Sequence, residues 1–198
     1  KSYGVPASKI VLTGFPLPES LSGKGMSKAK QNLAKRLSRL DPKRAYLAKY
    51  SDVVKRYLGS IPPMAKFPSP ARLTFAVGGA GAQKELGAAI LEGIAPLLER
   101  KEFELNLVAG IRKEVAEYWE KSMEEQGLKK FLGKSVRIFS AKSKEKAFEE
   151  FEAVLQETDI LWTKPSELSF YAALGIPLII APPIGSQEIQ NRKWILYV

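Results

Sequence analysis

A glycine-rich segment at residues 78–83 has the residue types and spacing that bind a diphosphate. The segment lies between an apolar run and the start of a helical pattern, and its candidate residues are Gly78, Gly79, Ala80, Gly81 and Gln83. Glycines let the backbone approach phosphate oxygens, and a helix N-terminus offers free N–H groups and positive dipole. The third glycine of the dinucleotide-binding fingerprint falls on position 84, which is a lysine. A tight turn that binds nothing therefore fits the spacing equally well.

Two later segments place polar residues at the start of a helix. Ser166 and Glu167 follow a short apolar run, where Ser166 can cap the helix and the Glu167 carboxylate can accept hydrogen bonds from two ribose hydroxyls. Gln187, Glu188 and Asn191 follow a Pro/Gly loop and can share one side of a helix, facing the hydroxyls of a sugar. Capped surface helices have the same composition, so both alternatives stay open.

The chemistry open to this chain is limited, because the sequence has no cysteine and no histidine. Disulfides and thiolate metal sites are excluded, and so is the usual general base near neutral pH. We expect no metal and no cofactor. The segment Gly133-Lys134-Ser135 resembles the end of a P-loop, but the first glycine of that motif falls on Leu128 and no strand precedes it. It does not predict ATP or GTP hydrolysis.

The elements that hold these motifs alternate between strands and helices. Apolar runs separated by helical patterns predict an α/β fold, a Rossmann-like parallel sheet with helices on both faces. Such a sheet binds its ligand at the carboxyl ends of its strands, where these motifs fall. We expect strands at 9–13, 72–77, 103–109, 135–140, 159–163 and 177–181, and helices at 83–100, 113–126, 143–157, 166–174 and from 187 onward.

A basic segment at about 24–70 carries the charge of the chain. The formal net charge is +10, and residues 24–72 alone hold thirteen Lys/Arg against two acids. The segment reads as two helices, 27–40 and 43–58. We place Leu47, Tyr50, Val54, Tyr57 and Leu58 on the apolar stripe of the second helix.

This helical hairpin has three interpretations. It can be a solvated basic face over a packed helix pair, or a patch that holds the protein at an anionic membrane surface. The third interpretation is nucleic-acid binding. We expect it least, because tyrosines on the apolar stripe are not free to stack on bases.

The motifs together resemble the C-terminal domain of glycosyltransferase family twenty-eight. That family includes the bacterial peptidoglycan N-acetylglucosaminyltransferase and the plant galactolipid synthases. The resemblance covers roughly residues 5–18 and 71–194. It is carried, in the order of the family, by the segments 9–18 (KIVLTGFPLP), 78–81 (GGAG), 163–167 (TKPSE) and 183–191 (PIGSQEIQN).

The resemblance implies one half of a two-domain GT-B transferase that holds a nucleotide-diphosphate sugar, usually a UDP-sugar. Residues 78–81 would line the diphosphate, and Gln187 and Glu188 would touch the donor sugar. Gly110, Ile111, Arg112, Phe139 and Ser140 would lie at the nucleobase. The catalytic base would come from a missing N-terminal acceptor domain, so we expect no catalytic residue in this chain, which alone would be inactive.

The sequence departs from the family at two places. Ser166 and Glu167 stand where the family has two glycines, and the stretch 170–172 has no acid where the family has a ribose-binding glutamate. A binding module that has lost transfer activity is therefore an alternative. A nucleotide-sugar epimerase of the same fold is another, although that activity normally needs a histidine.

We expect a single nucleotide-sugar-binding domain over 1–198, with the hairpin inserted at 24–70, as a fragment of a larger two-domain protein. The longest apolar run, residues 176–183, is far shorter than the roughly 20 residues that span a bilayer. The first residues have no signal-peptide core. The expected location is the cytoplasm, peripheral to the inner face of the membrane through the hairpin.

Overall fold

Five parallel strands form the centre of the chain, as the predicted α/β class requires. A computed structural model describes residues 4–12, 26–64, 69–78, 83–166 and 168–197. The spatial order is β3-β2-β1-β4-β5, and every neighbouring pair is parallel. This Rossmann-like order confirms the predicted fold class. The strands are β1 (Ala71–Ala76), β2 (Phe103–Gly110), β3 (Val136–Ser140), β4 (Ile160–Thr163) and β5 (Leu178–Ile180).

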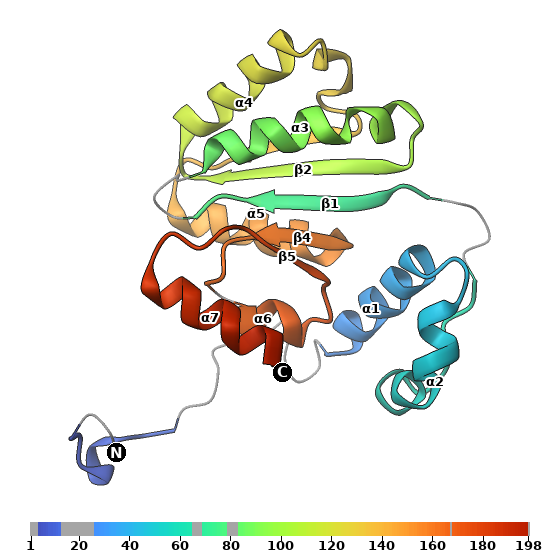
Figure 1. Cartoon of the computed structure of the whole chain (residues 1–198), viewed down its shortest axis with the longest axis vertical. Coiled ribbons are helices and arrows are strands. Elements are labelled where there is room, and N and C mark those ends of the chain that lie inside the picture. The colour runs from blue at the N-terminus through green and yellow to red at the C-terminus, as the bar shows by residue number, and fades with distance from the viewer. Residues whose placement is uncertain (1–3, 13–25, 65–68, 79–82, 167, 198) are drawn as a thin grey trace.

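Helices cover both faces of this sheet (Figure 1). Two of them, α3 (Lys84–Glu99) and α4 (Lys113–Glu125), pack on one face of β1 to β3. On the other face lie α5 (Lys144–Glu157) and α6 (Leu168–Ala173), and α7 (Ser186–Tyr197) packs beside α6. No helix in the described part of the chain is both long and apolar enough to cross a bilayer.

The main core lies between α3, α4 and the first three strands, and Trp119 is its largest buried side chain. Its indole ring meets Phe75 edge-on at 6.0 Å between centroids, and its Nε1–H donates to the Lys84 carbonyl at 2.8 Å. The ring also lies against the backbone of Gly87, where a Cβ would come within 2.3 Å of the indole nitrogen. Only glycine lets α3 approach α4 this closely.

On the α3 side of the sheet, the described residues cover β4 and β5 only in part. Side chains alternate along each strand, so Ile160, Trp162 and Ile179 point to the side of α3. They line a hollow of about 360 Å³ together with the flank of that helix. We expected a buried strand at 177–181, but β5 is an edge strand whose Ile179 is exposed.

The basic segment forms a helical hairpin, as expected, with α1 (Met26–Leu40) and α2 (Ala45–Leu58). Asp41 connects the two helices. Its carboxylate accepts hydrogen bonds from the backbone N–H groups of Tyr46 at 3.2 Å and Leu47 at 2.9 Å. These are unpaired donors in the first turn of α2, and an acidic side chain is the preferred partner for them. The hairpin lies at the amino-terminal ends of the strands (Figure 1).

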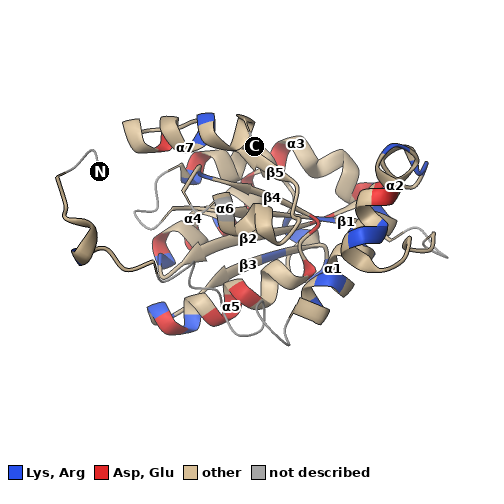
Figure 2. Cartoon of the chain, turned by 90° about the horizontal axis from the view of Figure 1, so that it is seen from below, with Lys and Arg blue, Asp and Glu red and all other residues tan. Residues whose placement is uncertain are grey.

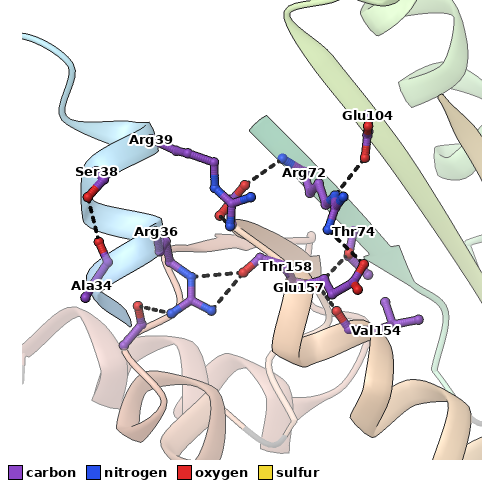
Figure 3. Close-up of polar contacts among 12 residues, drawn as sticks. Ala34, Arg36, Ser38, Arg39, Arg72, Thr74, Glu104, Val154, Glu157 and Thr158 are labelled. Carbon is purple, nitrogen blue, oxygen red and sulfur yellow. Dashed lines mark hydrogen bonds and ion pairs between the residues drawn. The ribbon is translucent and has the colours of Figure 1, made fainter. Parts of the chain in front are cut away.

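Arg36 of α1 fastens this hairpin to the sheet domain (Figure 3). It is only 3% exposed, so it does not belong to the solvated face that the sequence predicts for the hairpin cations. Its Nε and Nη2 donate to the Thr158 carbonyl at 2.9 and 2.8 Å, and its Nη1 donates to the carbonyls of Leu174 and Gly175 at 3.2 and 3.1 Å. These carbonyls end α5 and α6, where the helix dipole favours a cation.

A second arginine completes the attachment. Arg39 Nη2 lies 2.8 Å from an oxygen of Asp159, whose side chain is fully buried at the start of β4. The other oxygen of this carboxylate accepts the backbone N–H of Arg72 in β1 at 2.9 Å. Burial raises the pKa of Asp159, although the Arg72 N–H and the neighbouring guanidiniums oppose that shift. Burial also lowers the pKa of Arg36 to about 10.

Two expectations for the first third of the chain are wrong. Residues 9–12 are not a strand, because Ala7–Lys9 is a 3-10 helix and the next three residues are exposed without regular structure. A strand needs a neighbour to satisfy its backbone, and no described strand pairs with this segment. Tyr50 and Tyr57 are exposed instead of lying on the buried stripe of α2, which consists of Leu47 and Val54.

Gly87 and Gly93 lie in the same helix and should respond to alanine in opposite ways. Gly93→Ala meets no atom within 4 Å and should raise the free energy of unfolding by roughly 0.5–1 kcal/mol, because alanine loses less backbone entropy. Gly87→Ala should lower it by about 1–3 kcal/mol, because its Cβ would overlap the Trp119 indole. Urea denaturation of both variants measures the difference, and a shift of the same sign in both would contradict this packing.

Arg36 should contribute far more to stability than its neighbour in sequence, Lys35. We expect Arg36→Met to lower the free energy of unfolding by about 3 kcal/mol or more, since it leaves three carbonyls without their cation. Lys35→Met removes the same charge from an exposed position and should change stability by less than about 0.5 kcal/mol. Equal effects in urea denaturation would show that the guanidinium is not the attachment point.

The raised pKa of Asp159 predicts the sign of a pH dependence. Between the unfolded pKa and the higher folded pKa, the folded chain binds more protons than the unfolded chain. The contribution of this group to the free energy of unfolding therefore falls as pH rises from about 4. The Asp159→Asn variant cannot titrate at this position. The free energy of unfolding of the wild type minus that of the variant should therefore decrease between about pH 4 and 7. The decrease should be about 1.4 kcal/mol for each pH unit that separates the folded and unfolded pKa values of Asp159. If this difference grew with pH, the neighbouring arginines would lower the pKa of Asp159 by more than burial raises it.

Candidate functional site

The strand order places a topological switch point between β1 and β4. The chain runs outward from β1 to β2 and β3, and then returns to the opposite side of β1 through β4 and β5. In open parallel sheets the ligand crevice lies at such a point, outside the carboxyl ends of the two strands. We call the region between the ends of β1 and β4 the crevice. Gly78 and Lys164 stand at the two sides of this crevice.

Lys164 lies directly against the loop after β1. A Cβ on Gly78 would lie 3.0 Å from Cδ, 3.5 Å from Cε and 3.6 Å from Nζ of this lysine. Glycine at position 78 therefore leaves room for the lysine side chain to cross the crevice. A larger residue there would press on the methylene chain of the lysine.

The charge of Lys164 is only partly compensated. Its side chain is 12% exposed, and Nζ lies 3.7 Å from Oε1 of Glu188, at the long end of the range for an ion pair. The other carboxylate oxygen of Glu188 accepts the backbone N–H of Ile184 at 2.8 Å and so fixes the loop before α7. A mostly buried cation whose one partner in the described part of the chain is distant favours an additional anion.

Two amides join the loops of the crevice to each other. Gln83, at the start of α3, donates from Nε2 to the Pro182 carbonyl at 3.0 Å. Asn191 of α7 donates from Nδ2 to the Pro165 carbonyl at 2.9 Å and lies 3.5 Å from the Ser166 carbonyl. The segments after β1, β4 and β5 thus meet at one edge of the sheet, as the sequence predicts.

The residues expected at a nucleobase do not all come together. Gly110, with φ +64°, ends β2, and its carbonyl accepts the N–H of Ala141 at 2.8 Å. Ile111 and Ser140 line a hollow of about 580 Å³ beside α4. Phe139 points to the other face of the sheet and lines a separate hollow of about 200 Å³ against α5. Strand alternation makes this separation unavoidable, because Phe139 and Ser140 are adjacent in β3.

The remaining predicted site residues are described in turn. Arg112 precedes α4 and lies 3.8 Å from Glu114. Ser166 and Gln187 are exposed at the crevice loops. Gly79, Ala80, Gly81 and Glu167, which were expected to hold the diphosphate and ribose, lie outside the described residues. Across the described ranges, no three Asp or Glu side chains gather as metal ligands.

Lys164 was not among the predicted site residues, although it lies within the segment 163–167. The predicted residues of this segment were Ser166 and Glu167, at the start of the helix that follows. The available signal was position: a lysine directly after an apolar strand stands at the carboxyl edge of a parallel sheet. Its contact with Gly78 depends on β4 pairing with β1, and this long-range pairing is not visible in local spacing.

Comparison with known proteins gives a family and no function. No curated protein and no solved structure matches the chain. One family model matches residues 64–192, which include the whole sheet and the crevice but not α1 or α2. The chain therefore belongs to the family described as "Domain of unknown function (DUF6938)".

Proposed function

We propose that the crevice between β1 and β4 binds the diphosphate of a nucleotide sugar, with UDP-sugars as the substrate class. The observation that carries this proposal is Lys164, a mostly buried cation across Gly78 at the switch point, whose ammonium lies 3.7 Å from Glu188, its one ion-pair partner among the described residues. A diphosphate oxygen beside Nζ would supply the missing negative charge. The start of α3 at Lys84 adds helix N–H groups on the same side.

In this proposal the chain is the donor half of an inverting glycosyltransferase. An acceptor hydroxyl forms a bond to the anomeric carbon while the bond from that carbon to the diphosphate breaks. The hydroxyl proton goes to a base outside this chain. Lys164 and the N-terminus of α3 would stabilise the negative charge that grows on the leaving diphosphate, which is the electrostatic part of such catalysis.

A binding module without transfer activity is a second candidate, and one observation favours it. The described helix α6 has no carboxylate, and Tyr171 at its centre is buried against Phe151, with ring centroids 6.2 Å apart. A ribose would find no acid on this helix. If ribose is not recognised, inorganic pyrophosphate should bind about as tightly as UDP, whereas a UDP-sugar transferase should prefer UDP by about tenfold or more.

The Lys164 proposal is tested by isothermal titration with UDP, UMP and uridine. We expect affinity to rise with each phosphate, and Lys164→Met to weaken UDP binding by about tenfold or more, since a charged hydrogen bond is lost. Lys121→Met is the matched control, because it removes one exposed lysine from α4 and should leave affinity unchanged. No heat with wild-type protein at millimolar UDP, or equal loss in both variants, would overturn the assignment.

A further inference from the structure

The outward side of α2 carries an aromatic and apolar strip that is exposed in the described part of the chain. Tyr46, Tyr50 and Tyr57 are 47%, 37% and 63% exposed, and Val53 is also exposed. Helix α2 is kinked at Tyr50, where φ is −121° and ψ is 23°. The rings of Tyr46 and Tyr50 are 4.7 Å apart, and Val53 and Tyr57 are one turn apart after the kink. We call these four residues the tyrosine strip.

The hairpin that carries this strip has many exposed cations and few exposed acids. Between residues 26 and 64 one acidic side chain is exposed, Asp52, because Asp41 caps α2. Figure 2 shows the positive charge along α1 and α2, at one end of the molecule. The exposed cations of these residues are Lys28, Lys30, Lys35, Lys43, Lys49, Lys55 and Arg56.

We propose that the tyrosine strip and its cations dock on the anionic surface of a lipid bilayer. Charge complementarity identifies the partner as anionic, since seven exposed cations face one acid. The side chains identify it as a lipid surface, because tyrosine has an apolar ring and a polar hydroxyl that fit the headgroup layer, with lysines reaching the phosphates. The proposal does not depend on ligand binding at the crevice.

Nucleic acid is the less suitable anion for this strip. Base stacking needs a free ring face. The ring of Tyr50 already has the Lys49 ammonium over it at 5.0 Å from its centroid, and Tyr46 lies against the same ring. At a lipid surface only the ring edges and hydroxyls need to reach the headgroups, so these contacts do not interfere.

The attachment of the hairpin fixes the orientation of the docked domain. Arg36 and Arg39 join α1 to the residues just before β4, whereas Lys164 follows the end of the same strand. The tyrosine strip and the crevice therefore belong to opposite ends of the sheet. A domain docked through α2 keeps its crevice facing away from the lipid.

The experiment is co-sedimentation of the chain with vesicles of phosphatidylcholine alone or mixed with phosphatidylglycerol, at physiological salt. We expect binding only to the anionic vesicles. Lys49→Glu, Lys55→Glu and Arg56→Glu together should weaken it by about a hundredfold or more, at about fivefold per charge near the surface. Reversal of Arg36 or Arg39 is unsuitable, because both hold the fold.

Matched variants separate the strip from net charge. Lys142→Glu, Lys144→Glu and Lys146→Glu make the same charge change at exposed positions near the start of α5, and should keep most of the binding. Tyr46→Ser with Tyr57→Ser changes no charge and should weaken binding about tenfold. Circular dichroism confirms that each variant is folded.

Three results would overturn the proposal. The first is that the wild type does not sediment with anionic vesicles. The second is that the control reversal at 142–146 loses as much binding as the α2 reversal. The third is that a single-stranded RNA oligonucleotide binds more tightly than the vesicles and releases the chain from them, which would make nucleic acid the partner.

Discussion

All five strands run in one direction, and this single constraint gives the domain two chemically different ends. Each helix that follows a strand returns antiparallel to it, so helix N-termini gather at the carboxyl edge of the sheet and helix C-termini at the amino edge. Unpaired N–H groups and positive dipole therefore collect at one end, and unpaired carbonyls with negative dipole at the other. Each end needs a partner of opposite charge.

The hairpin supplies that partner at the amino edge. Arg36 reaches the carbonyls that end α5 and α6 with one planar guanidinium, a geometry that a lysine cannot reproduce. Leu33 of the same helix lies against Gly175, where a Cβ would come within 2.9 Å of its Cδ1, and φ is +63°. The glycine that ends α6 is therefore required both by its own backbone and by the close approach of α1. A segment outside the matched family region is thus joined to the sheet by specific contacts.

Local patterns in the sequence predicted the helices and strands, but not the contacts between residues that are far apart in the chain. Every strand of the sheet and every helix from α1 to α7 was expected within a few residues, because apolar periodicity and Gly/Pro boundaries are local signals. The inward turn of Arg36 could not be predicted, since its partners lie more than 120 residues away. For the same reason the sequence placed the crevice at the carboxyl edge but did not single out Lys164, and it grouped Phe139 with Ile111 and Ser140, which line a different hollow.

The carboxyl edge differs from the amino edge in how its polar groups are satisfied. Gln83, Glu188 and Asn191 use their side chains to hold the crevice loops together, so a ligand that took these groups would have to break bonds between the loops. Among the described residues, Lys164 has no such bond, and its ion-pair partner Glu188 lies at 3.7 Å. In the proposed site, the amides and Glu188 would act as positioning groups, and the lysine would be the group that contacts an incoming anion. At the amino edge of the sheet, Arg36 of the chain itself donates to the helix carbonyls. At the carboxyl edge, an external anion would accept from the helix N–H groups and from this lysine.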